Sequence, residues 1–200
     1  MKKHVIKFFS NLILNDLKEE NIFAWLGGGC LRDFFSGEPL NEINDIDIYV
    51  TNETDLARLI EFFSDRGGVI TFETDTIIEI PYRNFIFELH KFYYPSPEIM
   101  VTTTDTTISS AFIDIYGTFV SHEDFFIDLA ARRIVFTYLY HFDLTLSRVQ
   151  KLIKKGFTMD NVQINKLGYK LRLIFEREKL EKQSKSEELT VQLTNTFENE

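Results

Sequence analysis

The chain has 200 residues, a formal net charge of −9 at pH 7 and a pI near 5.0. Hydrophobic residues make up 44% of it and Phe alone occurs 20 times, so there is enough apolar material for a core, and wholesale disorder is excluded. The acidic balance disfavours a long nucleic-acid duplex lying across the whole surface, because phosphate contacts require Lys and Arg.

The N-terminal residues and the cysteine content bear on location. Residues 1–21 place apolar side chains at helical spacing between polar ones, which predicts an amphipathic helix and not a signal peptide. The single cysteine, Cys30, excludes an intrachain disulfide and favours a reducing, cytoplasmic compartment. No uninterrupted apolar run approaches the roughly 18 residues that a membrane span needs, so we expect no membrane partner.

The elements that follow alternate between strands and helices. The strands are expected at 22–26, at 45–50, at two or three places within 69–94 with a break near 81–84, and as a hairpin over 111–120. The helices are expected at 30–35, 51–64 and 143–157. A polar, Thr-rich stretch follows Pro97. This order predicts an α+β fold with α/β-like character, in which a mixed central sheet is flanked by helices in a single domain.

Asp45 and Asp47 are the first candidates for a chemical role. Residues two apart on a strand point to the same face, about 6.5 to 7 Å apart along the backbone. Two carboxylates on one face repel each other unless cations lie between them, and Mg²⁺ takes carboxylates together with nucleotide phosphates. A third carboxylate on an adjacent strand would complete a two-metal site for phosphoryl or nucleotidyl transfer. An ordinary exposed strand face would show the same pair.

The third carboxylate is assigned to Glu88. Alternation along its strand puts Glu88 and His90 on one face, so that a carboxylate and an imidazole project together. A partly exposed Glu on an edge strand would show the same pattern, and Glu79 and Asp75 are the alternatives.

Gly28 and Gly29 end a buried strand and open a short helix. Without side chains they allow backbone N–H groups to approach an anion, and the N-terminus of the helix favours negative charge. Arg32 follows within one turn and either braces a phosphate or pairs with Asp33. A tight structural turn would carry the same glycines.

Taken together, these residues resemble the head domain of the tRNA CCA-adding enzyme and poly(A) polymerase family, in the polymerase-β nucleotidyltransferase superfamily. The matching features, in chain order, are Gly28-Gly29, Arg32-Asp33, a short helix ending in Gly37, and Asp45-x-Asp47. The resemblance continues more faintly over 105–111 and 128–134. It implies a nucleotidyltransferase-like head domain at 22–136. The amphipathic helix at 1–21 precedes this domain, and spacing and composition predict a helical region at 137–175 and a charged helix or disordered tail at 176–200.

The resemblance also implies an activity: metal-dependent transfer of a nucleoside monophosphate from an NTP such as ATP to a hydroxyl acceptor. Two Mg²⁺ ions are expected on Asp45 and Asp47, with Glu88 assisting. Nucleotide-binding roles are expected for Gly28, Gly29, Arg32, Asp33, Asp105 and Arg148. The acceptor stays open among an RNA 3′ end, as in RNA processing, a small molecule and a protein side chain.

The chain departs from the family pattern at several positions. Thr103 and Thr104 stand where the family has paired arginines, and Ser109 stands where it has Asn. No Glu-Asp pair precedes Arg148 at the spacing of the family's base-selecting segment, and the helical domains that hold tRNA are not expected here. CCA addition to tRNA therefore does not carry over, and a catalytically inactive binding or assembly component is the alternative.

Overall fold

The structure, a computed structural model, describes residues 2–39, 42–43, 45–139, 142–177 and 179. Its centre is a seven-stranded mixed sheet with the strand order β3-β4-β5-β2-β1-β6-β7. The strands are β1 (Ala24–Gly27), β2 (Asp45–Val50), β3 (Phe72–Glu73), β4 (Ile77–Tyr82), β5 (Phe85–Tyr93), β6 (Ala111–Asp114) and β7 (Phe119–Ser121). Strands β2 and β5 run parallel and the other neighbours antiparallel, so the predicted mixed sheet is confirmed.

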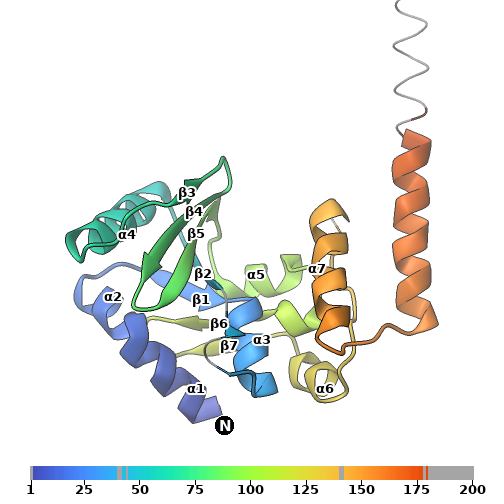
Figure 1. Cartoon of the computed structure of the whole chain (residues 1–200), viewed down its shortest axis with the longest axis horizontal. Coiled ribbons are helices and arrows are strands. Elements are labelled where there is room, and N and C mark those ends of the chain that lie inside the picture. Colours follow the sequence, from blue (N-terminus) through green and yellow to red (C-terminus); the bar gives the residue numbers. More distant parts are fainter. Residues whose placement is uncertain (1, 40–41, 44, 140–141, 178, 180–200) are drawn as a thin grey trace, which may run out of the picture.

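Helices precede, connect and follow the strands of this sheet in the chain (Figure 1). They are α1 (Lys2–Phe9), the π-helical segment η1 (Ser10–Leu14), α2 (Asn15–Glu19), α3 (Gly29–Ser36), α4 (Glu53–Asp65), α5 (Pro97–Thr103), the 3₁₀ turn η3 (Thr107–Ser109), α6 (Phe125–Ala130) and α7 (Phe142–Lys154). Residues 161–177 form a further helix, which stands apart from the sheet beyond α7. None of the helices in the described part of the chain has the length and apolar character of a membrane span.

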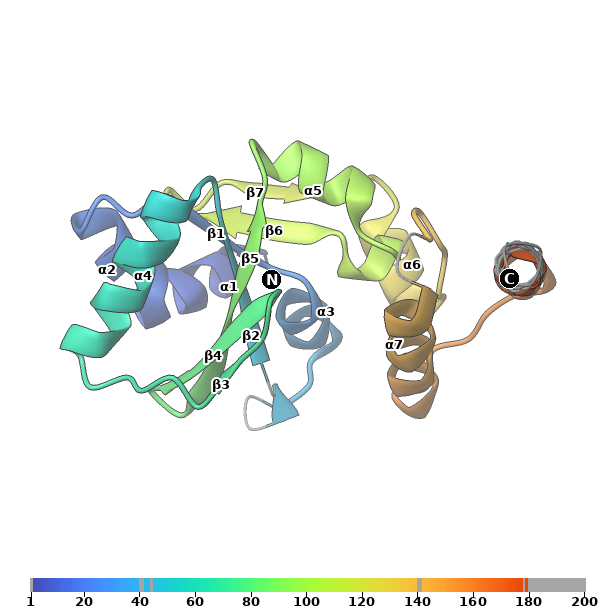
Figure 2. The same ribbon diagram turned by 90° about the horizontal axis from the view of Figure 1, so that it is seen from above.

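One face of the sheet carries the main hydrophobic core. On β2 and β5 the alternate residues Ile46, Ile48, Phe87 and Leu89 are at most 1% exposed. They belong to one core with side chains of the N-terminal helices, α3 and α4, among them Val5, Phe9, Leu31, Leu59 and Phe63. Figure 2 shows α1, α2 and α4 together on this side of the sheet. Burying each such side chain contributes about 1.5 to 3 kcal/mol, which fixes the direction of the polar residues between them.

The opposite face is covered only in part, by α5. Met100 and Val101 of this helix pack against Trp25 of β1 and Phe112 of β6 in a second, smaller cluster. The Thr-rich composition gave no helical signal here, because β-branched residues lose rotamer freedom in a helix. Packing of the apolar pair and Pro97 in the first helical turn outweigh that propensity.

The β4–β5 hairpin sets the position of Glu88. Its turn consists of Arg83 and Asn84, whose φ angles are 49° and 70°, as a two-residue type I′ turn requires. The break predicted near 81–84 is therefore confirmed. The turn sets the register of β5 against β4, in which Glu88 lies opposite Glu79. Strand β5 pairs in turn with β2, where Asp47 lies opposite Glu88 and the register shifts only between Ile48 and Val50.

The C-terminal part contains α7 and the helix over 161–177, in the region where helices were expected. Helix α6, in contrast, was not predicted. The charged helix or tail expected over 176–200 lies outside the described residues, apart from 176, 177 and 179, which are helical.

Candidate active site

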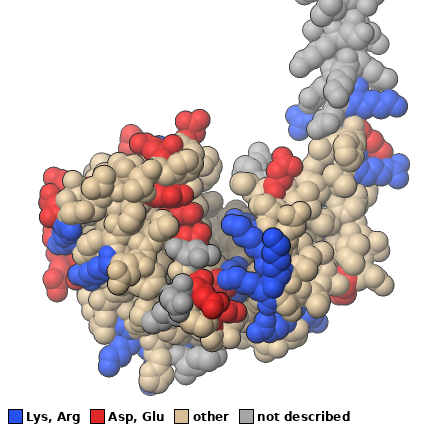
Figure 3. Space-filling model, in the orientation of Figure 1, with Lys and Arg blue, Asp and Glu red and all other residues tan. Residues whose placement is uncertain are grey.

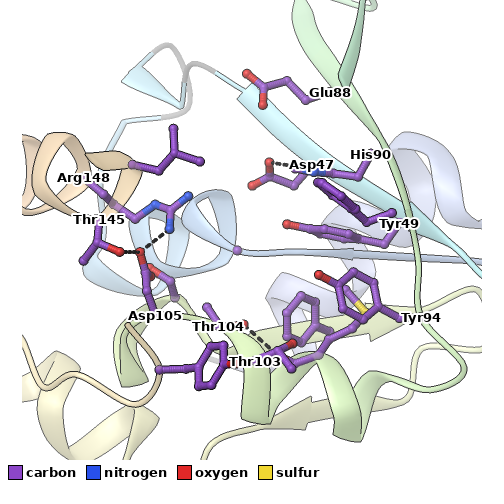
Figure 4. Close-up of a pocket in the computed structure, with 17 residues that line it drawn as sticks. Asp47, Tyr49, Glu88, His90, Tyr94, Thr103, Thr104, Asp105, Thr145 and Arg148 are labelled. Atoms are coloured by element: carbon purple, nitrogen blue, oxygen red, sulfur yellow. Dashed lines mark hydrogen bonds and ion pairs between the residues drawn. The ribbon is translucent and has the colours of Figure 1, made fainter. Parts of the chain in front are cut away.

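A pocket of about 270 Å³ opens on the polar face of the sheet. Figure 4 shows its two sides: carboxylates, an imidazole and a tyrosine from β2 and β5 on one, and residues from α7 and the segment after α5 on the other. Figure 3 shows basic side chains gathered along the edge of α7 that borders the hollow. The volume is close to the lower end of small-molecule sites, about 300 Å³.

The structure brings together the three carboxylates that the sequence indicated. Asp45 and Asp47 lie on the half-exposed face of β2, while Ile46 and Ile48 are buried. In the parallel pairing of β2 with β5, Asp47 lies directly opposite Glu88. Asp45 and Glu88 also share a hydrogen bond. Three acidic side chains from two adjacent strands therefore meet on one surface.

These carboxylates repel one another, and their pKa values show it. Burial, and then the charges of Asp47 and Asp45, raise the pKa of Glu88 from 4.5 to about 7. Burial, followed by the charge of Asp47, also raises the pKa of Asp45, while Lys151 of α7 and the hydrogen bond with Glu88 act in the opposite direction. A divalent cation would relieve this repulsion, and carboxylate oxygens are ligands that Mg²⁺ prefers. The residues present therefore fit such an ion.

The alternative carboxylates lie farther from Asp47. Glu79 of β4 lies opposite Glu88 on the outer side of β5, and its charge contributes to the raised pKa of Glu88. Asp75 is exposed in the loop between β3 and β4. Of the three candidates, Glu88 is the residue whose strand position adjoins Asp47.

His90 joins this group from β5. Its Nε2 lies 2.9 Å from Oδ1 of Asp47, and its ring stacks on Tyr49 with centroids 4.2 Å apart and planes at 13°. Ligand atoms of Asp47, Glu88 and His90 all lie within 4.8 Å of one another. Burial, and then the charge of Asp47, raise the pKa of Tyr49 well above its usual range, so its hydroxyl stays protonated.

Gly28 lines the pocket directly beside Asp47. Its φ is +76°, and a Cβ atom added there would lie 2.6 Å from Oδ2 of Asp47. Any other residue would therefore collide with this carboxylate as well as adopt an unfavourable backbone conformation. The N–H of Gly28 donates to the carbonyl of Ala111 at 3.0 Å, so this N–H is not available to an anion.

Arg32 and Asp33 form a buried ion pair next to the pocket. Arg32 Nε lies 2.8 Å from Asp33 Oδ1, and Lys155, the first residue after α7, contacts the other oxygen of Asp33 at 2.8 Å. Arg32 also contacts Ser109 of η3 at 3.5 Å. Neither Arg32 nor Asp33 is among the described residues that line the pocket, and Gly29 faces the Arg32 guanidinium. The structure thus shows the pairing role, which ties α3 to η3 and α7.

The side of the pocket opposite the carboxylates centres on Asp105 and Arg148. Arg148 forms an ion pair with Oδ2 of Asp105, and Thr145 donates to the same oxygen at 3.3 Å. Burial alone would lower the pKa of Arg148, but Asp105 outweighs it and the net shift is upward, so the guanidinium stays charged. The other oxygen of Asp105, Oδ1, is buried and has no hydrogen-bond partner among the described residues.

Thr103 and Thr104, which stand in place of the family's paired arginines, also line the pocket. Their hydroxyls point back along α5. Thr103 donates to the Ile99 carbonyl at 3.1 Å and Thr104 to the Met100 carbonyl at 2.7 Å. This part of the pocket therefore carries no positive charge from α5.

Several residues that line the pocket were not identified from the sequence alone. Tyr49 continues the alternation of Asp45 and Asp47 on β2, so a signal for it was present. Thr145 precedes Arg148 by three residues, the spacing that places side chains on one face of a helix. Tyr94 lies directly after β5 and Tyr138 lies in a loop, so no periodicity predicts the direction of either side chain.

Solved structures show which class of fold this is. The chain is similar to a tRNA-processing enzyme in an apo form, with 17% identity and a TM-score of 0.63 over 84% of this chain and 47% of that one. It is also similar to a tRNA nucleotidyltransferase complexed with a primer tRNA and an incoming ATP analog. Here the identity is 19% and the TM-score 0.60, over 82% of this chain and 51% of that one. The CCA-adding enzyme of Bacillus stearothermophilus in complex with CTP has 19% identity and a TM-score of 0.56, over 74% of this chain and 39% of that one.

These likenesses confirm the nucleotidyltransferase-type fold, and the chain spans about half the length of the first two proteins. A family model described as "Gabija anti-defense 2 family protein" matches residues 1–132. The chain therefore belongs to the Gabija anti-defense 2 family. No curated protein matches it.

Proposed function

We propose that this chain is a metal-dependent nucleotidyltransferase, which transfers a nucleoside monophosphate from an NTP to a hydroxyl acceptor. The observation that carries the proposal is that Asp47 and Glu88 line one side of a pocket from two adjacent strands, with Asp45 beside them on the same face of β2. Mg²⁺ ions on these carboxylates would stabilise charge on the reacting phosphate and lower the pKa of the acceptor hydroxyl.

The residues around the carboxylates would bind and orient the nucleotide. The missing side chain of Gly28 lets the Asp47 carboxylate lie directly against the backbone, because a Cβ atom there would be 2.6 Å from Oδ2 of Asp47. Arg148 and Lys151 of α7 bring positive charge to the opposite side, where a triphosphate needs it. The unpartnered Oδ1 of Asp105 would accept a hydrogen bond from a base amino group or a ribose hydroxyl.

Three classes of acceptor are proposed, two of them from the family and from the solved structures that the chain resembles. Solved neighbours are complexed with a primer tRNA or with CTP, so an RNA 3′ end is one acceptor class. Membership of the Gabija anti-defense 2 family supports a second class, an acceptor hydroxyl on a component of the Gabija system, such as a protein side chain. A small molecule is the third class. All three would use the same carboxylates.

A second candidate is an inactive member of the fold that acts by binding. The observation that favours it is the pair Thr103 and Thr104, whose hydroxyls are engaged by α5 where the resemblance implies two arginines. Such a protein would bind its target without a nucleotide. The intact carboxylates, and the glycine that lets Asp47 lie against the backbone, favour the enzyme.

The discriminating experiment follows the label of an NTP. Purified protein would be incubated with Mg²⁺, RNA and Gabija components, using each NTP labelled in turn at the α- or the γ-phosphate. We expect α-label, but not γ-label, in a product with wild type and none with Asp47→Asn. Transfer of γ-label would indicate a kinase. The proposal fails if no product forms and equilibrium dialysis finds no metal-dependent binding of any NTP.

A further inference from the structure

The carboxylate side of the pocket contains a nitrogen donor, His90. This residue follows Glu88 by two positions on β5, so both side chains lie on the same face of the sheet. The Nε2 atom points at Oδ1 of Asp47 from 2.9 Å (Figure 4). The donor set of the described residues is therefore mixed, with oxygen from Asp47 and Glu88 and nitrogen from His90.

The spacing of these atoms matches neighbouring ligands of one ion. An octahedral ion with bonds of about 2.0 to 2.1 Å places adjacent ligand atoms about 2.9 Å apart and opposite ones about 4.2 Å apart. The Nε2–Oδ1 distance of 2.9 Å fits an adjacent pair. All three ligand atoms, including that of Glu88, lie within 4.8 Å of one another. The group therefore closes around a single ion with little movement.

The imidazole is held in this direction by its neighbours. Tyr49 stacks on the ring at 4.2 Å with an interplanar angle of 13°, so the ring edge faces Asp47. The side chains of His90 and Asp47 are each 18% exposed, which restricts rotation of both. Such packing orients a ligand before an ion binds. In the metal-free protein the same contact is a hydrogen bond, and an ion would replace its proton.

A nitrogen ligand changes which ion the site prefers. Mg²⁺ is a hard ion that takes oxygen ligands, whereas imidazole suits divalent first-row transition ions, and carboxylates suit Mn²⁺ as well. A position built from Asp47, Glu88 and His90 differs in this respect from one that uses only carboxylates. Asp45 lies on the same face of β2 as Asp47 and offers only oxygen donors to the second metal ion.

We propose that Asp47, Glu88 and His90 form a mixed oxygen–nitrogen site that selects a divalent transition-metal ion such as Mn²⁺ over Mg²⁺. The inference rests on the proposed function, because it concerns the same carboxylates. It assigns different ions to the two metal positions: a transition ion at His90 and Mg²⁺ at Asp45. His90 thereby becomes a metal ligand for the reaction.

The experiment detects the nitrogen ligand directly and uses no nucleotide. Mn²⁺ alone would be added to the whole protein, and pulsed EPR would measure coupling between bound Mn²⁺ and ¹⁴N. We expect this coupling in wild type and in the control His4→Ala, which changes an exposed histidine on α1. His90→Ala should lose it and bind Mn²⁺ about tenfold or more weakly, since even supporting partners of metal ligands contribute about 10- to 100-fold.

A second variant separates ligand chemistry from folding. His90→Asp replaces nitrogen with oxygen, so it should keep Mn²⁺ binding, lose the ¹⁴N coupling and reduce the preference for Mn²⁺ over Mg²⁺ by about tenfold. Bound Mn²⁺ without ¹⁴N coupling, coupling that persists in His90→Ala, or no bound Mn²⁺ in wild type would each overturn the proposal. A wild type that shows the coupling but binds no NTP would instead refute the proposed function and leave the metal site standing.

Discussion

The two sides of the pocket are built in different ways. The carboxylate side takes Asp47, Glu88 and His90 from adjacent strands, where register and alternation fix every direction. The helical side takes Asp105 and Arg148 from segments 43 residues apart, joined by an ion pair. The first keeps the acidic residues that the resemblance implies, and the second departs from it. We infer that the sheet holds the metal ligands, while the helical side, which would recognise the substrates, has diverged from the family pattern.

The largest expected effect comes from removing charge on the carboxylate side. Asp47→Asn should lower nucleotidyl transfer by about 10³-fold or more, because metal-ion stabilisation of the transition state contributes several kcal/mol and about 1.4 kcal/mol corresponds to a factor of ten. Transfer of α-labelled NTP would measure it. Asp75→Asn, at an exposed carboxylate outside the pocket, is the matched control and should leave the rate unchanged. Equal rates for both variants would place the chemistry elsewhere.

Breaking the ion pair on the helical side should affect stability. Arg148→Met leaves Asp105 as a buried, uncompensated carboxylate, which should lower the free energy of unfolding by about 2 kcal/mol in urea denaturation, less than for a fully buried pair because Arg148 is half-exposed. Arg148→Met combined with Asp105→Asn should recover most of this loss. Arg172→Met removes an exposed pair with Glu176 and serves as the control. A double variant as unstable as the single one would argue against the pairing.

Two glycine variants test the contact between backbone and carboxylate. Gly28→Ala and Gly37→Ala both place alanine at a positive φ, of +76° and +78°, and each should lose about 1 kcal/mol of stability. Only the first places a Cβ atom 2.6 Å from Asp47, whereas a Cβ atom at Gly37 would have no atom of another described residue within 4 Å, apart from its chain neighbours. Calorimetric titration should therefore show weaker metal-dependent nucleotide binding, by about tenfold or about 1.4 kcal/mol, for Gly28→Ala alone. Equal weakening in both would show that Asp47 is not crowded.

The smallest effect is a pH dependence from Glu88. Its pKa is about 7 in the folded protein against 4.5 ordinarily, so the folded state binds the proton more tightly and stability falls as pH rises from about 4.5 to about 7. Glu88→Gln cannot ionise. In metal-free buffer it should be more stable than wild type at pH 8, by about 1 kcal/mol after allowing for solvent screening, and equally stable at pH 4.

Urea denaturation at both pH values measures this difference, and Glu61→Gln on the exposed face of α4 is the control. A Glu88→Gln variant that is no more stable than wild type at pH 8 would mean that the carboxylates are already compensated.

The carboxylate side could be predicted from the sequence because it depends on local periodicity. Alternation placed Asp45 and Asp47 on one face of β2, and the same rule placed Glu88 and His90 together on β5. That β5 lies beside β2 was not given by any pattern, but the choice of Glu88 agrees with the register. The metal and nucleotide roles of these residues stay predictions.

The helical side could not be predicted in the same way. The pairing of Asp105 with Arg148 depends on how α7 returns to the sheet, which no local spacing encodes. Helix α5 is stabilised by Met100 and Val101 against β1 and β6, and its threonines donate to its own carbonyls. For the same reason two partners of Arg32, a phosphate and Asp33, were both consistent with the sequence. Only the packing of α3 against η3 and the residue after α7 showed that Asp33 holds it.

Thermal unfolding tests the central claim most directly. Wild type and the double variant Asp45→Ala/Asp47→Ala would be unfolded with each NTP, with and without Mg²⁺ or Mn²⁺. A ligand at about 100 times its dissociation constant stabilises the folded state by about 2.7 kcal/mol, which raises the midpoint by about 5 to 10 °C in a chain of this size. We predict this rise for wild type only when both NTP and metal ion are present, and none for the variant. The absence of any rise in wild type, or an equal rise in both proteins, would contradict an NTP site built on these carboxylates.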